Sequence, residues 1–231
     1  MVFNVGDQVQ TSDSGKVFFD KSRSFVAGPL NRFRLFRTKG HFEMIGVRFH
    51  LGTFPLLSNP LKELRNRAVR LDAIWEEKTL RSDIRSLELQ LTQLSETRHQ
   101  IACVEPFLMK VLRQWKEPED LLTRAISLIE KSSGRISIRA LASALGTSNR
   151  QLERRFSHRL GLTPKALCRI IRFRQVKVLL ESAHTATGGA LACAAGYYDQ
   201  THFIHEFRSF TGQTPGCYKK AFPLGSFICS Y

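Results

Sequence analysis

Residues 140–164, ALASALGTSNRQLERRFSHRLGLTP, return further along the chain as residues 190–215, ALACAAGYYDQTHFIHEFRSFTGQTP. Both copies begin with an Ala-rich segment, contain a glycine (Gly146 or Gly196) after it, and end in Thr-Pro. Two copies are too few for a solenoid, which needs three or more stacked repeats. The repeat therefore predicts a small helical module that occurs twice.

Each copy predicts a helix, a tight turn and a second helix. Its glycine permits a sharp turn, and Ser148 in one copy and Asp199 in the other are suitable caps for the second helix. At about 100° per residue, Leu152 and Phe156 share a face of that helix, with Arg154 opposite. In the other copy the equivalent inner face holds Phe203, Phe207 and Phe210.

One continuous helix should join the modules. Thr163 is a suitable cap and Pro164 a suitable first residue, and no Gly or Pro follows before about residue 182. A helix of this length spans about 28 Å, close to the roughly 34 Å of one turn of B-DNA. Two helices on such a strut could enter successive major grooves.

The first half reads as a β-rich domain with helices after it. Aromatic and β-branched runs at 17–19, 33–36 and 42–49 are separated by Gly, Pro and Asn, which is typical of strands. Their aromatic residues are expected first in the core and second in a ligand pocket. A helical stripe follows, formed by Leu80, Ile84, Leu87, Leu91 and Leu94. Since it covers only two heptads, it favours core packing over a dimer seam.

The expected class is therefore α+β, with two domains. A small β-rich sensor-like or dimerisation-like domain occupies residues 1–115, and an all-α domain with two helix-turn-helix modules occupies residues 116–222. A linker at 114–120, QWKEPED, marks the boundary, and residues 223–231 form an apolar tail.

Positive charge is the outstanding feature of the composition. The chain has 35 Lys and Arg against 20 Asp and Glu, a net charge of +15. Residues 150–177 alone hold nine basic side chains and one acidic one, a net charge of +8. An anionic partner is expected. With no long apolar run and no positively charged leader, we expect a cytoplasmic protein without membrane contact.

The residues indicate neither an enzyme nor a metal or cofactor site. The five cysteines are widely spaced and lack metal-ligand spacing, so we expect small apolar side chains in a reducing compartment. None lies in the Pro-Cys-His-Arg setting of alkyl-transfer repair proteins. The chain also has no Gly-rich phosphate loop, H-E-x-x-H or G-x-S-x-G.

The repeat and its linking helix resemble the DNA-binding domain of AraC/XylS-type transcription regulators, from about Asp120 to Phe222. The matching positions are Leu141, Ala142, Gly146, Ser148, Leu152, Arg154, Phe156, Gly161, Pro164, Arg172, Phe173, Leu179, Leu180, Leu191, Ala192, Gly196, Tyr197, Asp199 to Phe203, Phe207, Gly212, Thr214, Pro215 and Tyr218. His205 departs from the family, where an arginine is common.

The first half resembles the late part of an uncharacterised sensor-type domain that precedes such modules. The resemblance rests on Gly28-Pro29, Gly46 to Phe49 with Gly52, and Asn59 to Leu64. Only 27 residues precede Gly28. We therefore expect a shortened domain with weak or absent control by a small-molecule effector.

The resemblance implies which side chains meet DNA. Those expected to face bases are Ser148, Asn149, Arg150, Glu153, Arg154, Asp199, Gln200, Thr201, Ile204 and His205. Those expected at phosphates are Arg155, Arg159, Lys165, Arg169, Arg172, Arg174 and Arg208. Any one outward arginine is as readily a solvated side chain, and Arg172 is as readily an internal structural residue.

These observations predict a sequence-specific DNA-binding transcription regulator. Double-stranded DNA is its expected partner, with RNA polymerase a further one, and the chain is expected to act as a monomer or a homodimer. The alternative is a non-specific nucleic-acid or partner-binding protein with a non-sensing first half. It predicts binding that depends on salt and barely on sequence.

Overall fold

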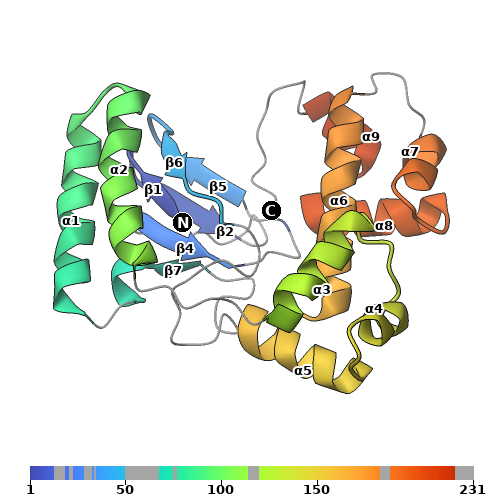
Figure 1. The fold of residues 1–231 in the computed structure, drawn as a ribbon. Helices are drawn as coiled ribbons and strands as arrows, with labels where there is room; N and C mark the ends of the chain where they lie inside the picture. Colours follow the sequence, from blue (N-terminus) through green and yellow to red (C-terminus); the bar gives the residue numbers. More distant parts are fainter. Residues whose placement is uncertain are drawn as a thin grey trace. The chain divides into compact units, whose positions relative to one another are not determined.

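The computed structural model describes residues 1–12, 19–20, 23–28, 33, 35–49, 68–74, 77–113, 120–182 and 188–221. The chain divides into two compact units, Met1–Gly28 with Arg34–Pro118, and Pro29–Phe33 with Glu119–Tyr231. Strands and helices build the first unit, and the elements of the second are helices (Figure 1). The α+β class is thus confirmed. The expected tail at 223–231 and linker at 114–119 lie outside the described residues.

The strands of the first unit form two small antiparallel sheets. One has the order β6-β1-β4-β7, made by Met44–Gly46, Val2–Asn4, Ser24–Ala27 and Ala68–Arg70. The other has the order β3-β2-β5, made by Phe19–Asp20, Val9–Ser12 and Leu35–Thr38. In the first sheet Val2 lies opposite both Phe25 and Gly46.

Sequence reasoning found part of this arrangement. Strands β3, β5 and β6 overlap the three expected runs, although residues 17, 18 and 34 lie outside the described part. Strands β1, β2, β4 and β7 were not expected, because three or four residues carry too little alternation to separate a strand from a loop. The expected core role was wrong for Phe36 and Phe42, which are 36% and 52% exposed.

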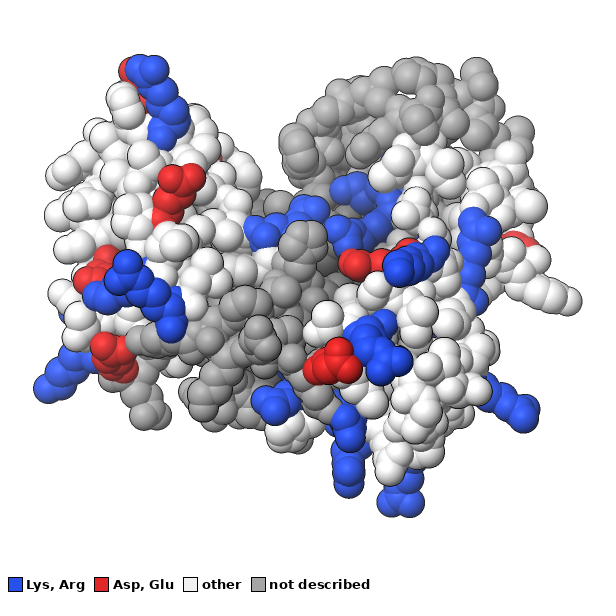
Figure 2. All heavy atoms as spheres, viewed as in Figure 1, with Lys and Arg blue, Asp and Glu red and all other residues white. Residues whose placement is uncertain are grey.

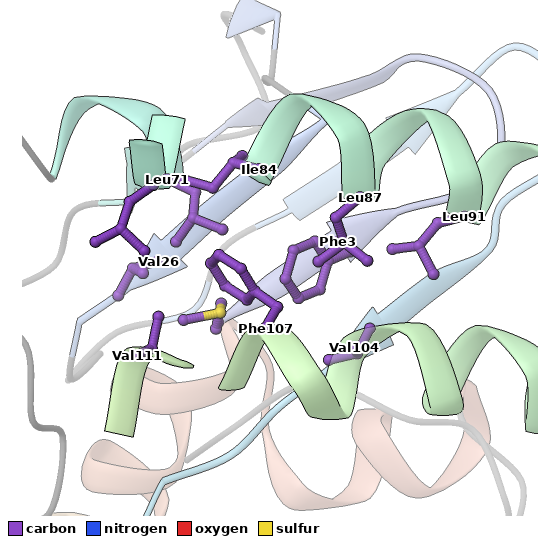
Figure 3. Close-up of a cluster of buried hydrophobic side chains, with 11 residues drawn as sticks. Phe3, Val26, Leu71, Ile84, Leu87, Leu91, Val104, Phe107 and Val111 are labelled. Atoms are coloured by element: carbon purple, nitrogen blue, oxygen red, sulfur yellow. The ribbon is translucent and has the colours of Figure 1, made fainter. Parts of the chain in front are cut away.

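Two helices cover the first sheet and close its core. They are α1, Lys78–Gln93, and α2, Thr97–Leu112, and the short 3₁₀ helix η2, Leu71–Ala73, precedes them. Figure 3 shows side chains from the strands and both helices pointing into one cluster, in which the rings of Phe3 and Phe107 meet edge to face at 6.3 Å. The expected stripe fills this core with Leu80, Ile84, Leu87 and Leu91. Core packing of the stripe is thereby confirmed, except that Leu94 follows the end of α1.

The second unit is a chain of helices. Their bounds are α3 Asp120–Lys131, α4 Ile138–Ala144, α5 Asn149–Leu160, α6 Pro164–Ser182, α7 Gly188–Ala194, α8 Gln200–Thr211 and α9 Pro215–Ala221. The expected linking helix is α6, and Thr163 caps it by accepting a hydrogen bond from the backbone N–H of Ala166 at 3.1 Å. In the described ranges, no helix is both long and apolar enough to cross a membrane.

The apolar faces predicted for the two modules are buried as expected. Leu152 and Phe156 on α5, and Phe203 and Phe207 on α8, are all 0% exposed. Phe173 of α6 stacks on the ring of Phe210 at 4.6 Å. Both repeats therefore pack their inner faces into the core of one helical unit, and Figure 1 shows α5 by the start of α6.

Candidate nucleic-acid interface

The start of α5 is fixed by a capping box. The Ser148 hydroxyl accepts a hydrogen bond from the backbone N–H of Gln151 at 3.2 Å, and the Gln151 side chain accepts one from the backbone N–H of Ser148 at 3.3 Å. Two N–H groups that a helix start leaves without partners are satisfied together. The capping box therefore fixes where α5 begins and holds the backbone of its first turn in the helical conformation.

We expect Ser148→Ala to lower the free energy of unfolding by about 1 kcal/mol, because the N–H of Gln151 loses its acceptor. Urea denaturation of the DNA-free chain, followed by circular dichroism, measures the loss. Ser157→Ala on the same helix is the matched control, since Ser157 is exposed and lies outside the cap. Equal losses in both variants would contradict the capping role.

The outer face of α5 carries the polar residues predicted to meet DNA. Asn149, Arg150, Glu153, Arg154 and Arg159 are exposed, and Arg155 is partly buried. In Figure 2 basic side chains project from the end of the second unit that holds α5. By the helical period, Arg150 and Arg154 lie opposite the buried Leu152 and Phe156, whereas Asn149 and Arg159 lie nearer that buried side.

Helix α8 repeats this arrangement with fewer charges. Asp199 caps it by accepting a hydrogen bond from the backbone N–H of His202 at 2.7 Å. Its exposed side chains include four of the predicted ones, namely Gln200, Thr201, His205 and Arg208, and Ile204 is partly buried. The two candidate reading faces are thus built alike but differ in chemistry, with arginines on α5 and mainly neutral side chains on α8.

The predicted phosphate contacts on α6 divide into two groups. Lys165 is exposed and Arg174 is partly buried. Arg169 and Arg172 instead pair with Glu206 of α8, with nitrogen–oxygen distances of 2.9 Å and 3.9 Å. For these two arginines the structure favours internal pairing over phosphate binding, and for Arg172 this was the stated alternative.

Two residues of this region were missed by sequence reasoning. Glu206 was considered only as a neighbour of His205, yet its side chain is 4% exposed. Its position was a usable signal, because Phe203, Glu206, Phe207 and Phe210 follow the spacing of one buried helix face. Arg135 was also missed; it precedes α4 and donates to the carbonyl oxygen of Ala194 at 2.5 Å.

The cysteines follow the expectation only in part. Cys168 is buried, and burial raises the pKa of its thiol. Cys103 is partly buried, whereas Cys193 on α7 and Cys217 on α9 are exposed, so these last two do not pack as apolar core residues. Cys229 lies outside the described residues.

Two family models match the chain. Residues 141–221 match an AraC-type model described as a helix-turn-helix domain, and residues 1–70 match a domain of unknown function, DUF6597. The first match contains α5, α6 and α8 together with the turns that join them. The second covers the strands of the first unit.

Two relatives match less than half of the chain. The chain is 33% identical over 103 residues to "Probable bifunctional transcriptional activator/DNA repair enzyme AlkA" of Mycobacterium tuberculosis, covering 44% of this chain and 21% of that protein. It is 30% identical over 114 residues to "HTH-type transcriptional regulator MtrA" of Neisseria gonorrhoeae. This match covers 49% of this chain and 37% of that protein. The matched region thus spans well under half the length of either relative.

A solved structure is similar over nearly the whole chain. ToxT of Vibrio cholerae is 13% identical, with a TM-score of 0.52, and the match covers 96% of this chain and 89% of that one. At this identity the likeness shows a shared fold. The family match over residues 141–221 and the paired modules establish that the second half of the chain contains an AraC-type helix-turn-helix domain.

Proposed function

We propose that the chain regulates transcription by binding a specific sequence of double-stranded DNA, with α5 and α8 in successive major grooves. One observation carries the proposal: both helices have a capped start, a buried apolar face and an exposed polar face, and α6 joins them. An α-helix fits the major groove, where each base pair presents a distinct pattern of donors and acceptors.

The two helices would read bases by different chemistry. Arg150 and Arg154 are long donors suited to the O6 and N7 atoms of guanine, and Glu153 is suited to the amino group of cytosine. On α8, Gln200 fits adenine and Ile204 fits a thymine methyl group. We therefore propose that α5 is the stronger reader and that α8 adds a second, more neutral element.

Backbone contacts would position the protein without reading sequence. The exposed cations beside the reading faces, Arg159, Lys165 and Arg208, are the strongest candidates for phosphates. Each phosphate contact releases counterions, so the affinity should fall steeply as salt rises.

The proposal extends to a second partner, the location and the role of the first unit. Two relatives are named as a transcriptional activator and a transcriptional regulator, so we propose RNA polymerase as a second partner and the cytoplasm as the location. For the first unit we keep the expectation of little or no control by a small-molecule effector. Action as a monomer or as a homodimer is compatible with the proposal.

Replacing Arg154 by Ala tests the proposal after the preferred site has been selected from random DNA. The variant should bind the selected site about 10- to 100-fold more weakly, since one bidentate guanine contact contributes about 1–3 kcal/mol of discrimination. Its affinity for random DNA should fall much less, because only one charge is lost. Fluorescence anisotropy at two salt concentrations measures both affinities.

Arg124→Ala provides the matched control, because Arg124 is an exposed arginine of α3 that pairs with Asp120. This variant should keep the sequence preference. Equal losses on selected and random DNA in Arg154→Ala would contradict base reading by Arg154. If selection enriched no sequence, the non-specific alternative would stand instead.

A further inference from the structure

A buried carboxylate joins the second reading helix to the linking helix. The Oε2 atom of Glu206 lies 2.9 Å from Nε of Arg169 and 3.8 Å from Nε2 of His202, and its Oε1 atom lies 3.9 Å from Nη2 of Arg172. A carboxylate with a 4% exposed side chain is costly unless cations and hydrogen bonds surround it. Arg169 of α6 donates a hydrogen bond to it, and Arg172, one turn further along α6, adds a second positive charge 3.9 Å away.

Each arginine also lies near an aromatic ring, and Arg169 makes a further hydrogen bond. The guanidinium carbon of Arg169 lies 5.5 Å from the centre of the Phe210 ring, and its Nη2 donates to the Ser209 hydroxyl at 3.3 Å. The guanidinium carbon of Arg172 lies 5.5 Å from the centre of the Tyr197 ring. These contacts limit the directions in which the arginines can move, so the pairing fixes an orientation as well as a distance.

A second contact joins the two modules at a different place. Arg135, just before α4, donates from Nη2 to the carbonyl oxygen of Ala194 at 2.5 Å. The same side chain lies against Gly196, where an added Cβ would be 2.7 Å from its Nε atom. The segment that leads into the first module is therefore docked on the turn of the second.

We propose that Glu206 is a positioning residue for DNA binding. It holds α8 on α6 through Arg169 and Arg172, and thereby sets the distance and angle between the two reading faces. This inference rests on the proposed function. It assigns to Glu206 a role in recognising the spacing between two DNA elements, with no contact to DNA required.

Removal of the carboxylate separates this role from folding. The apolar face of α8 keeps the helix on the core through Phe203, Phe207 and Phe210. Without the negative charge, Arg169 and Arg172 are left close together with no counter-charge between them, so the defined orientation of α8 is lost. The first module keeps its own cap and its own buried face.

The test is Glu206→Gln in the full chain, with two DNA duplexes. One contains the selected two-element site, and the other is identical except that the second element is scrambled. The ratio of their two Kd values measures how much the second element contributes. We expect Glu206→Gln to reduce this ratio about 10-fold, which corresponds to the loss of about one specific base contact by a displaced α8.

The ratio distinguishes positioning from stability. A merely destabilised protein has a smaller folded fraction, which weakens binding to both duplexes equally and leaves the ratio unchanged. A one-base-pair insertion between the elements gives a second readout. It should weaken binding by the parent protein strongly and binding by Glu206→Gln much less, because a loosely held α8 tolerates altered spacing.

Two further variants complete the design. Glu130→Gln makes the same charge change at an exposed position of α3 and should keep the ratio of the parent. Glu206→Asp retains the charge and should recover most of the ratio. An unchanged ratio in Glu206→Gln, which includes equal weakening on both duplexes, would overturn the inference. A parent protein that did not distinguish the duplexes would contradict the proposed function itself.

Discussion

Replacing Phe207 by Ala should lower the free energy of unfolding of the second unit by about 3–5 kcal/mol, because it opens a cavity in the centre of the core. The Phe207 side chain is 0% exposed. Its ring contacts three others edge to face, at centroid distances of 5.5 Å to Phe173, 5.8 Å to Phe203 and 5.4 Å to Tyr218. Phe173 of α6, Phe203 of α8 and Tyr218 of α9 all lose this partner when the ring is removed.

Tyr198→Ala is the control for this prediction. Tyr198 lies in the turn before α8 and is 94% exposed, so its removal should cost less than about 0.5 kcal/mol. Urea denaturation followed by circular dichroism gives the two free energies. Hydrogen exchange measured by mass spectrometry then locates the loss. We expect faster exchange in α8 and α6 and unchanged exchange in α1 and α2, and a loss shared by all four helices would contradict separate cores.

The helices of the second unit could be predicted closely because several independent signals agree. For α6, the Thr163 cap, the favourable first residue Pro164 and the absence of breakers define both ends. For α5 and α8, a cap residue precedes a buried stripe of the correct period. Their polar outer faces follow from the same periodicity, so the candidate reading side chains could be named without coordinates.

The first unit could be predicted less well for a physical reason. Its strands are two to four residues long, and their stability comes from pairing with residues distant in sequence, as when Val2 lies opposite both Phe25 and Gly46. Such pairings leave no local pattern. Aromatic side chains were also poor guides, since Phe3 is 1% exposed and Phe42 is 52% exposed.

The pairing of Arg169 and Arg172 shows a different limit. A sequence gives the number of cations on a helix but not which of them face a buried carboxylate. Glu206 lies 37 residues from Arg169, and no periodicity links them. The positions of Phe203 and Phe207 did indicate that Glu206 faces inward, and a buried acid in a basic domain requires a cation. The partner's identity required the structure.

Gly134→Ala should destabilise the second unit by about 3 kcal/mol, since two separate penalties apply at this position. The residue lies in the turn after α3 with φ of +73°, a conformation that costs an L-residue about 1–2 kcal/mol. A methyl group there would also collide with the carbonyl oxygen of Cys168 and would lie 3.1 Å from the backbone nitrogen of Arg172. Overpacking against backbone of this kind costs about 1–3 kcal/mol.

Gly146→Ala separates the two penalties. Gly146 has φ of +63°, and an added Cβ would meet nothing within 4 Å, so only the conformational cost of about 1 kcal/mol should appear. Urea denaturation of both variants measures the difference, which is the cost of the collision alone. Equal values would mean that α6 moves away from α3 freely. Since the colliding atoms belong to the turn of α6 that carries Arg172, Gly134→Ala should also disturb the pairing with Glu206, whereas Gly146→Ala should leave that pairing intact.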